Sequence, residues 1–235
     1  VCTGWKKIGG NTFYFIPARQ NGAKGKMATG WRTIGKKKYY FRTSGKKGVK
    51  GARYKSEWVT IKGKNYYFNS NGSLNSNTMT EKQFIETVGK LASKDMKKSG
   101  ILASVTTAQA ILESGYGTTS LAMEAHNLFG MKASLSGNTW KSSWDGKTFK
   151  KSTREYLDGK WYTITDTFRS YSSFAQSVTD HSNYLRYAKN GNRLRYEGVV
   201  GNKSYRKTIK IIKNGGYATD PQYVSKICSL IKRYN

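Results

Sequence analysis

The first third of the chain alternates aromatic and polar positions, and this period of two predicts β-strands. Each of three segments contains a tryptophan, namely Trp5, Trp31 or Trp58, that is followed eight residues later by an aromatic triplet. Turns with glycine, lysine or asparagine separate the two halves, so each segment is typical of a β-hairpin. The tryptophans lie 26 and 27 residues apart, which indicates a repeat. Because one hairpin is marginal alone, the three are expected to stack into one core.

After the Asn- and Ser-rich stretch Asn69–Thr78, apolar residues recur at the helical spacing of three and four. This stretch is the best domain boundary, and it divides the chain into residues 1–78 and 79–235. A capping box directly after the boundary predicts a helix that starts at Thr80 and is ended by Gly100.

A second change of period falls at residues 137–170, where β-prone runs return among the predicted helices. Asp158-Gly159 lies between the runs Thr153–Leu157 and Lys160–Phe168, and Asp-Gly in this position is a strong hairpin signal. The pattern predicts a small β-lobe inserted into a helical domain. Further helices are expected at Ser173–Tyr187, at Tyr205–Lys213 and from Asp220-Pro221 onward. The fold class is therefore α+β, with an all-β hairpin-repeat region first.

The charge is strongly positive, with 42 Lys and Arg against 13 Asp and Glu and a formal net charge of +29. Such a field favours a polyanionic partner, which could be nucleic acid, an anionic membrane or a cell wall with teichoic phosphates and peptide carboxylates. No nucleic-acid-binding motif accompanies the basic residues, so a specific nucleic-acid partner is not expected. No uncharged run approaches the ~20 residues of a membrane span.

Cysteine and histidine add little candidate chemistry. Cys2 and Cys228 could form one disulfide, but Cys228 fits the apolar stripe of the last helix and is interpreted as a core residue. His181 lies on another apolar stripe and is expected to be a hydrogen-bonded structural residue. No Cys/His cluster has metal-ligand spacing, so neither a metal nor a cofactor is expected. The chain begins at Val1 without Met or a signal peptide, which we interpret as a mature or trimmed fragment.

The main candidate for chemistry is Glu113, the one carboxylate of the otherwise uncharged run Ile101–Ser114. An uncharged helix of this length is expected to lie at the centre of a domain, and the glycine after it is a usual helix stop. Glu113 would then have an apolar wall behind it and an open turn in front. Such a site raises a carboxyl pKa and suits a general acid. A solvated glutamate at a helix end is the alternative, and the spacing alone does not decide.

The segment Ala108–Lys132, which contains AQAILESGYGTTSLA and NLFGMK, resembles the signature of the family-73 glucosaminidases. Later motifs follow in the family's order: STREY at Ser152–Tyr156, FRSYSSFAQSVTDHSNYL at Phe168–Leu185 and YATDPQYVSKI at Tyr217–Ile227. These enzymes are bacterial peptidoglycan hydrolases. The resemblance implies a lysozyme-like helical catalytic domain that carries the inserted β-lobe.

The resemblance also implies roles for individual residues. Glu113 would be the proton donor, Glu155 the second acidic residue in the β-lobe, and Tyr217 a cleft residue near the scissile sugar. Either Glu155 acts as base or electrostatic partner, or the substrate's own 2-acetamido group does so with Tyr217 positioning it. Candidate substrate-binding residues are Asn127, Phe129, Trp140, Trp144, Trp161 and Asp220. The residues alone leave structural alternatives open: Asn127 would bond local backbone, Asp220 would cap the last helix, and the tryptophans would form the core of the lobe.

The repeats resemble the cell-wall-binding repeats of choline- and glucan-binding proteins. Their second strands carry Phe-Tyr-Phe or Tyr-Tyr-Phe and do not open with Trp, and their spacing is longer than in the choline family. Because a cationic ligand needs an aromatic cage, we favour packing of the repeat core over choline binding. Residues 1–78 carry +16 of the net charge, which favours attachment to wall polyanions such as teichoic acid.

These observations predict a secreted, cell-wall-associated endo-β-N-acetylglucosaminidase of the autolysin or cell-separation type. We expect it to act as a monomer on the glycan strands of peptidoglycan. One alternative is a muramidase or lytic transglycosylase, and another is a non-catalytic wall-binding protein. The presence of both Glu113 and Glu155 argues against the non-catalytic alternative.

Overall fold

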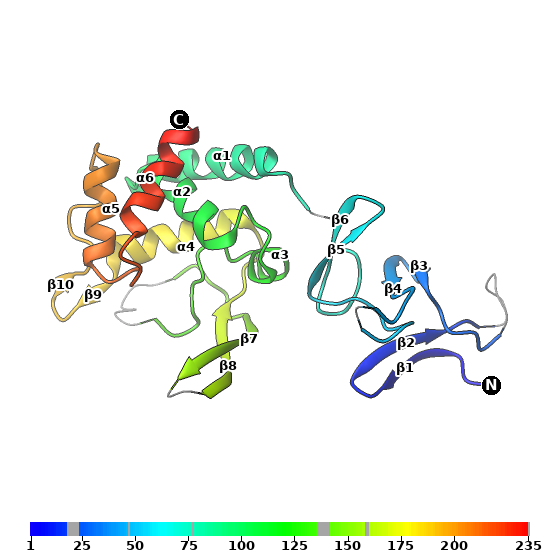
Figure 1. The fold of residues 1–235 in the computed structure, drawn as a ribbon. Helices are drawn as coiled ribbons and strands as arrows, with labels where there is room; N and C mark the ends of the chain where they lie inside the picture. The colour runs from blue at the N-terminus through cyan, green and yellow to red at the C-terminus, as the bar shows by residue number, and fades with distance from the viewer. Residues whose placement is uncertain (18–23, 47, 77, 136–141, 158–159, 235) are drawn as a thin grey trace. The chain divides into compact units, whose positions relative to one another are not determined.

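The computed structural model spans residues 1–235. It describes all of them except 18–23, 47, 77, 136–141, 158–159 and 235, and at 153–157, 160–162 and 164 it describes the backbone alone. The chain forms two compact units, Val1–Thr78 and Met79–Asn235, which Figure 1 shows as a β-hairpin region and a mainly helical region.

Three β-hairpins make up the first unit, as the repeated aromatic pattern predicts. Their strands are β1 (Gly4–Ile8), β2 (Asn11–Phe15), β3 (Gly30–Ile34), β4 (Lys37–Phe41), β5 (Glu57–Ile61) and β6 (Lys64–Phe68). The three antiparallel pairs share one register, so each tryptophan lies opposite a tyrosine of the second strand. These pairs are Trp5–Tyr14, Trp31–Tyr40 and Trp58–Tyr67. The hairpins are therefore structural equivalents of one another.

Segments that follow one hairpin are bonded to the hairpin before it. The backbone N–H of Arg53 donates to the carbonyl of Thr12 at 2.9 Å, and that of Leu74 donates to the carbonyl of Lys38 at 2.7 Å. A small buried core forms between the first two hairpins and contains Tyr14, Ala28 and Phe41. Neighbouring repeats thus supply the contacts that a single hairpin lacks, which confirms the expected stacking.

The second unit is a cluster of helices with a long hairpin between the third and the fourth. Its elements are α1 (Glu81–Ser99), α2 (Ala103–Ser114), α3 (Ser120–Ala125), β7 (Thr148–Leu157), β8 (Lys160–Arg169), α4 (Phe174–Tyr187), β9 (Lys189–Asn190), β10 (Arg193–Leu194), α5 (Tyr205–Asn214) and α6 (Tyr223–Tyr234). Helix α2 contacts α1, α5 and α6. This helix, in which Glu113 is the one charged residue, therefore lies at the centre of the unit, as its sequence predicts.

Local capping signals set the helix ends. The Thr80 hydroxyl accepts a hydrogen bond from the backbone N–H of Gln83, the Gln83 side chain bonds back to the Thr80 N–H, and Gly100 ends α1 in the left-handed conformation. Ser173 caps α4 through the N–H of Gln176, whose side chain reaches back to Ser172. Such caps contribute about 1 kcal/mol each, and the capping box at Thr80 was predicted from the sequence.

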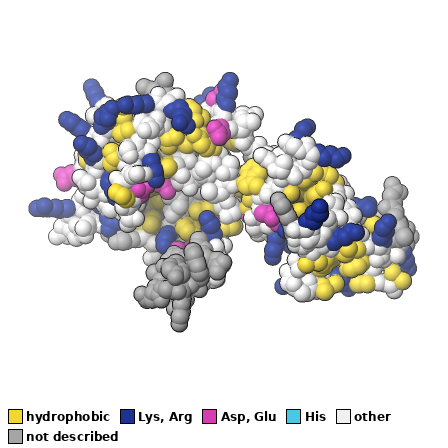
Figure 2. Space-filling view, viewed as in Figure 1, with side chains coloured by type: hydrophobic (Ala, Val, Ile, Leu, Met, Phe, Trp, Pro, Cys, Tyr) yellow, Lys and Arg dark blue, Asp and Glu magenta, His cyan; other side chains and the backbone are white. Residues whose placement is uncertain are grey.

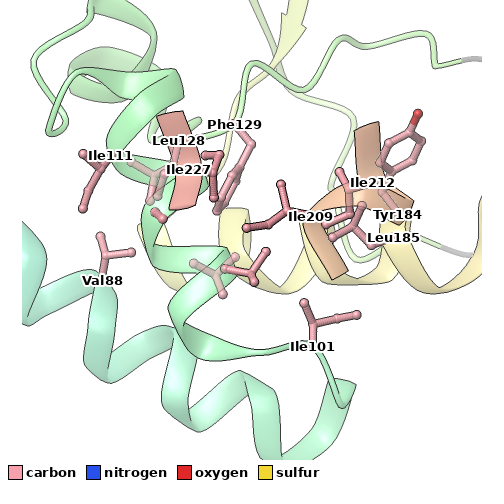
Figure 3. Close-up of a cluster of buried hydrophobic side chains, with 14 of the residues drawn as sticks. Val88, Ile101, Ile111, Leu128, Phe129, Tyr184, Leu185, Ile209, Ile212 and Ile227 are labelled. Atoms are coloured by element: carbon pink, nitrogen blue, oxygen red, sulfur yellow. The ribbon is translucent and has the colours of Figure 1, made fainter. Parts of the chain in front are cut away.

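Apolar side chains from α1, α2, α4, α5 and α6 meet in one core (Figure 3). Val88 on α1 and Ala110 on α2 have no exposed surface, and neither have Ile212 on α5 and Ile227 on α6. At about 25 cal/mol per Å² of apolar surface removed from water, this burial is the main favourable term of the unit. It fixes α2, and with it the site at the C-terminal end of α2.

The hairpin β7–β8 is longer than the sequence predicts, because its first strand begins at Thr148 rather than at Thr153. The Asp158-Gly159 turn lies outside the described residues. At the base of the β7–β8 hairpin, the backbone N–H of Arg169 donates to the carbonyl of Met131 at 2.9 Å. The backbone N–H of Ala133 donates to the carbonyl of Thr167 at 2.9 Å. The hairpin is thus bonded to the segment that follows α3.

Lysine and arginine side chains are scattered over the visible face of both units, with few acidic ones among them (Figure 2). None of the helices among the described residues is both long and apolar enough to cross a membrane. Cys2 is exposed and Cys228 is buried in α6, and both are free thiols. The interpretation of Cys228 as a core residue is confirmed, and the two cysteines are not bridged.

Candidate active site

Helix α2 ends directly after Glu113 in a turn that its own sequence specifies. Gly115 adopts φ +54° as the C-cap. The Ser114 hydroxyl donates to the carbonyl of Ala110 at 2.5 Å and accepts from the N–H of Gly117 at 2.8 Å. A Cβ at Gly117 would lie 2.6 Å from the Phe84 ring, so this position needs glycine. The run Glu-Ser-Gly-x-Gly therefore holds the helix end against α1.

The Glu113 side chain combines access to solvent with an unfavourable environment for charge. The residue is exposed, yet the protein atoms around its carboxyl raise its pKa to about 7 through desolvation. A group with this pKa is partly protonated at neutral pH and can give its proton to a bound molecule. The raised pKa agrees with the apolar wall predicted behind the carboxyl, and the exposure of the residue agrees with the open turn predicted in front of it.

Two tyrosines lie within the electrostatic field of Glu113. Its charge contributes to the raised pKa of both Tyr217 and Tyr223, after desolvation as the larger cause in each case. Tyr223 is buried in α6, and its hydroxyl accepts a 2.8 Å hydrogen bond from the side-chain amide of Gln109. Gln109 lies one helical turn before Glu113 on α2, so the pair joins α2 to α6 beneath the carboxylate.

Sequence reasoning missed Gln109 and Tyr223. The available signal was a long polar side chain four residues before Glu113, in a helix whose other uncharged polar residues are Ser and Thr. Residues four apart share one face of a helix. A buried amide also needs a partner, but the sequence did not indicate that the partner lies 114 residues later.

Tyr217 follows α5 after the Gly215-Gly216 turn. Its ring lies 5.6 Å from that of His181, at an interplanar angle of 88°, and 6.1 Å from that of Tyr223. Its hydroxyl is buried and has no hydrogen-bond partner among the described residues. An unpartnered buried hydroxyl costs free energy, and a ligand would bond to this one only after the side chains that cover it move.

His181 corrects one expectation. The sequence predicts a hydrogen-bonded structural histidine, but neither ring nitrogen has a hydrogen-bond partner among the described residues. The ring instead stacks on Phe129, with centroids 3.8 Å apart and planes at 11°. Complete burial lowers the pKa of His181 to about 3, so it is neutral at physiological pH.

Phe129 and Asn127 belong to the core of the turn after α3. Phe129 is buried against His181. The Asn127 amide donates to the carbonyls of Met131 and Arg169 at 2.9 and 2.8 Å, and its oxygen accepts from the N–H groups of Phe129 and Met131. Asn127 thereby uses its full hydrogen-bonding capacity on backbone. The Asn127 side chain bonds local backbone, which is the structural alternative named above. None of its polar atoms is left to bond the substrate.

Asp220 also has a structural role in its surroundings. Its carboxylate accepts from the N–H of Gln222 and from the ammonium of Lys226, both at 2.8 Å. These bonds, that of the Lys226 side chain first, lower the pKa of Asp220. The carboxylate caps the turn before α6, which itself begins at Tyr223. The last helix therefore begins two residues after Pro221, later than Asp220-Pro221 predicts, and Asp220 caps the preceding turn rather than the helix itself.

The remaining candidates belong to the β7–β8 hairpin and to the segment of the chain before it. Glu155 lies on β7 opposite Tyr162, and Trp161 lies on β8 opposite Tyr156; their side chains lie outside what is described. Trp140 lies outside the described residues. The indole of Trp144 donates to the carbonyl of Lys147 at 2.7 Å and faces the Arg169 guanidinium.

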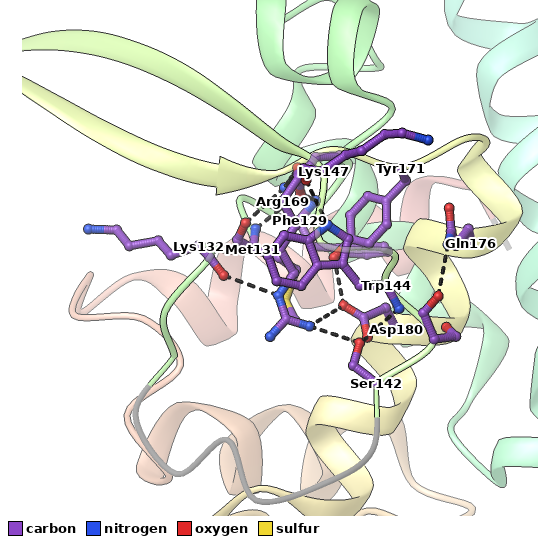
Figure 4. Close-up of polar contacts among 12 residues, drawn as sticks. Phe129, Met131, Lys132, Ser142, Trp144, Lys147, Arg169, Tyr171, Gln176 and Asp180 are labelled. Atoms are coloured by element: carbon purple, nitrogen blue, oxygen red, sulfur yellow. Dashed lines mark hydrogen bonds and ion pairs between the residues drawn. The ribbon is translucent and has the colours of Figure 1, made fainter.

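A buried ion pair, not predicted from the sequence, fixes the base of this hairpin (Figure 4). Arg169 and Asp180 pair at 2.7 Å with both side chains fully enclosed. Asp180 also accepts from the hydroxyls of Tyr171 and Ser142, and Arg169 donates to the carbonyl of Lys132. Additional bonds of this kind make a buried pair tolerable. The pair connects the end of β8 to α4.

Among the residues that the structure describes, no three or more His, Cys, Asp and Glu side chains are grouped as metal ligands would be. The titratable side chains that the structure brings together around the end of α2 are the Glu113 carboxyl and the hydroxyls of Tyr217 and Tyr223.

Comparison with known proteins identifies both units. A family model described as mannosyl-glycoprotein endo-beta-N-acetylglucosaminidase matches residues 89–235. A cell wall binding repeat matches residues 3–15, 29–47 and 56–74. Exo-glucosaminidase LytG of Bacillus subtilis is 34% identical over 155 residues, which are 66% of this chain and 52% of LytG. The autolysin of Enterococcus faecalis is 33% identical over 164 residues, which are 68% of this chain and 21% of the autolysin.

Solved structures agree with the fold. The catalytic domain of the autolysin Auto from Listeria monocytogenes is 34% identical, with a TM-score of 0.57, and the match covers 68% of this chain and 88% of that domain. A glycoside hydrolase domain of FlgJ from Salmonella typhimurium is 28% identical, with a TM-score of 0.52, and the match covers 66% of this chain and 97% of that domain. The chain spans about half or less of the length of the curated relatives above. It belongs to the glucosaminidase family of glycoside hydrolases and carries cell wall binding repeats in front of that domain.

Proposed function

We propose that the protein hydrolyses the glycosidic bond after N-acetylglucosamine within the glycan strands of bacterial peptidoglycan. The observation that carries this proposal is Glu113, an exposed carboxyl with a pKa of about 7 at the end of the central helix. Two comparisons support it. The relatives include proteins named exo-glucosaminidase, autolysin and peptidoglycan hydrolase. The family model matches the whole of α2 and the residues of the site around it.

Cleavage begins with transfer of the Glu113 proton to the oxygen of the glycosidic bond. The C–O bond then breaks and leaves positive charge on the sugar ring, as in other glycoside hydrolases. A pKa near 7 suits this step, because enough acid remains protonated at neutral pH to react. The deprotonated Glu113 is then able to take a proton from the water that completes hydrolysis.

The positive charge on the sugar needs a stabilising partner, and two partners fit. Glu155 is carried on β7, within the inserted hairpin. In the first arrangement it acts as base or electrostatic partner. In the second, the substrate's 2-acetamido group attacks its own ring carbon. The hydroxyl of Tyr217, which no described residue bonds, would then hold that group in place. The inserted hairpin would form one wall of the cleft, with Trp144 and Trp161 as candidate sugar contacts.

A muramidase is the main competing function. Relatives from Lactococcus lactis are named probable N-acetylmuramidase and are 34% identical over 160 residues. That enzyme would cut the alternate bond with the same acid. A lytic transglycosylase would also use a glutamate at this position but would leave an anhydro sugar. An inactive wall-binding protein would leave the glycan intact.

One experiment separates these functions. Purified cell walls are digested with the full chain, the new ends are reduced with borohydride, and the fragments are identified by mass spectrometry. Reduced N-acetylglucosamine ends support the proposal. Reduced muramic acid or anhydromuramic acid ends overturn it, and an unchanged wall supports the inactive protein. Early release of long fragments supports endo action, whereas release of small units from chain ends would show exo action.

The hairpin repeats would hold the enzyme, acting as a secreted monomer, on the cell wall. The matched cell wall binding repeats and the excess of Lys and Arg in this unit support attachment to anionic wall polymers such as teichoic acid. Exposed charges are screened by salt, with a Debye length of about 10 Å at 0.1 M. Wall binding should therefore weaken as salt is raised, and salt-insensitive binding would contradict the electrostatic part of this proposal.

A further inference from the structure

A groove between α1, α2 and α6 lies outside the site around Glu113. It encloses a cavity of about 270 Å³, and none of the described residues that line it is charged. Aliphatic side chains of all three helices form its walls, among them Ile85 of α1, Ile111 of α2, and Leu230 and Ile231 of α6. The second unit therefore has an apolar hollow that the proposed hydrolysis does not use.

Gly89 keeps this groove open. A glycine inside a helix is destabilising relative to alanine, so it needs a reason. Its backbone is not in the left-handed region that would require glycine. A Cβ at Gly89 would meet no atom within 4 Å, so the packing of the described residues does not require glycine either. The space above Gly89 lines the groove, and a ligand that enters the groove would account for it.

A second hollow continues the groove over the outer face of α1, and it carries charge. The two hollows share three residues of α1. The second is also lined by Lys90, Lys94 and Lys97, together with Glu86. Spacings of four and three place the lysines on one side of the helix. None of the three ammonium groups forms an ion pair with a carboxylate of the described residues, so the row is free to hold an anion beside an uncharged groove.

The polarity of the groove selects a hydrocarbon chain. Two hydroxyls in the lining are already bonded, because Thr107 donates to the carbonyl of Ala103 and Tyr234 pairs with Tyr116, both at 2.8 Å. An extended peptide would place its N–H and C=O groups against helices whose own backbone groups are bonded. A hydrocarbon chain brings no polar group, and burial of each of its methylenes is favourable.

The size of the cavity also disfavours a partner helix. One turn of an α-helix occupies about 400 Å³ at a diameter of 10 Å and a pitch of 5.4 Å. The cavity of about 270 Å³ is smaller than this, so a thinner chain fills it better. A second copy of this protein is disfavoured by charge, because two chains of net charge +29 repel each other.

We propose that the groove binds the acyl chain of an anionic lipid, whose phosphate is held by Lys90, Lys94 and Lys97. Clusters of lysine attract anionic lipids, and ammonium groups bond phosphate strongly. This inference goes beyond the proposed function and does not depend on which glycosidic bond is cut. It gives the catalytic unit an affinity for lipid that is separate from the wall attachment of the repeats.

Isothermal titration calorimetry of the full chain tests the site with lysophosphatidylglycerol, which has one acyl chain and one phosphate, below its critical micelle concentration. Two comparison ligands separate the parts of this lipid. Lysophosphatidylcholine has the chain without the net charge, and glycerol phosphate has the charge without the chain. Each should bind at least about tenfold more weakly than lysophosphatidylglycerol, which corresponds to 1.4 kcal/mol.

Substitutions of Gly89 test the cavity. Gly89→Leu fills the space above the helix and should weaken binding at least about tenfold, while leucine favours the helix more than glycine does. Gly89→Ala is the matched control, because its single methyl group has no atom within 4 Å, and it should bind like the parent. Ser93→Leu, at an exposed position that lines both hollows, blocks the groove independently and decides the matter if Gly89→Leu misfolds.

A pair of double variants tests the lysine row. Lys94→Gln with Lys97→Gln removes two charges that line the second hollow and should weaken binding at least about tenfold. Lys82→Gln with Lys98→Gln removes two charges from the same helix, at exposed positions outside the lining. This control pair should change binding little, whereas binding that depends only on net charge would respond equally to both pairs.

Several results would overturn the proposal. These are parent-like binding by a folded Gly89→Leu or by Ser93→Leu, equal losses in the two lysine pairs, and binding of either comparison ligand as tightly as lysophosphatidylglycerol. Circular dichroism of each variant verifies the fold. Digestion of purified walls by the parent chain is measured separately, so a failed lipid site and a failed hydrolase are distinguishable.

Discussion

The side-chain amide of Gln109 donates a 2.8 Å hydrogen bond to the hydroxyl of Tyr223, and this bond joins α2 to α6 one helical turn below Glu113. Both side chains are buried. Because the amide oxygen of Gln109 has no hydrogen-bond partner among the described residues, the bond to Tyr223 is the polar contact that the structure gives this amide. The floor of the candidate site therefore depends on two residues far apart in the chain.

A double-mutant cycle should reveal this dependence. Tyr223→Phe leaves the buried Gln109 amide without its acceptor and should cost about 1–3 kcal/mol of stability. Gln109→Leu should cost a similar amount, and the double variant should cost less than the sum by about 0.5–3 kcal/mol. Urea unfolding of the three variants measures the coupling. Strictly additive losses would mean that the bond contributes nothing specific.

Glu113→Gln should lower kcat on purified walls by about 10²–10⁴-fold while the far-UV circular dichroism stays unchanged. The amide keeps the shape of the side chain but has no proton to give, and general acids of this kind contribute about 10²–10⁴-fold. Glu86→Gln, which changes an exposed carboxylate on α1, is the control and should be fully active. Substantial turnover by Glu113→Gln would remove Glu113 from the mechanism.

The raised pKa of Glu113 also makes a stability prediction. Its pKa is about 7 in the folded protein, above the ordinary value of 4.5 for a glutamate carboxyl. Between these values the folded state binds more protons than the unfolded state, so stability falls as pH rises through this window. Glu113→Gln removes this dependence. The free energy of unfolding of the variant minus that of the parent should therefore be larger at pH 8 than at pH 4. Urea unfolding of both proteins at both pH values measures this difference. A stability difference between variant and parent that is the same at both pH values would mean that the Glu113 carboxyl is not desolvated in the folded protein.

His181 should act in the opposite direction. It stays neutral in the folded state, with a pKa near 3, while the unfolded chain protonates it near 6.5. Stability is therefore lost as pH falls below 6.5, by up to about 1.4 kcal/mol per pH unit. His181→Phe keeps the stacking on Phe129 and removes the titration. The free energy of unfolding of the variant, relative to that of the parent, should therefore increase as pH falls from 7 to 4.5, as measured by urea unfolding. If both lose stability equally, His181 is not buried as described.

Asp180→Asn should destabilise the second unit strongly, because it leaves the Arg169 guanidinium buried without its counter-charge. Breaking a buried pair in this way typically costs about 3–5 kcal/mol. The exposed pair of Lys147 and Asp145, which has a similar distance of 2.8 Å, is the matched control. Asp145→Asn should change the unfolding midpoint little. A small effect of Asp180→Asn would mean that the hairpin base is held by its backbone bonds.

Local sequence signals predicted much of the site's frame. Thr80 with Gln83 and Gly100 set the ends of α1, and Ser114 with Gly115 set the end of α2, because caps are formed by residues within a few positions of each other. The hairpin repeat was equally readable, since its strands are joined by short turns. The β7–β8 hairpin was predicted too short, because the run before Thr153 is rich in lysine and lacks a clear alternation.

Sequence by itself placed Glu113 at the stop of an uncharged helix and placed a tryptophan at the same position in each hairpin. These features follow from periodicity and from neighbours in the chain. The tertiary structure alone decided which groups surround them. Tyr223 lies 114 residues from Gln109, Asp180 completes the burial of Arg169, and the guanidinium of Arg53 lies 5.6 Å from the ring of Trp5. Such pairs depend on how separate elements pack and on which way each side chain points, and neither is encoded in the local pattern of residues.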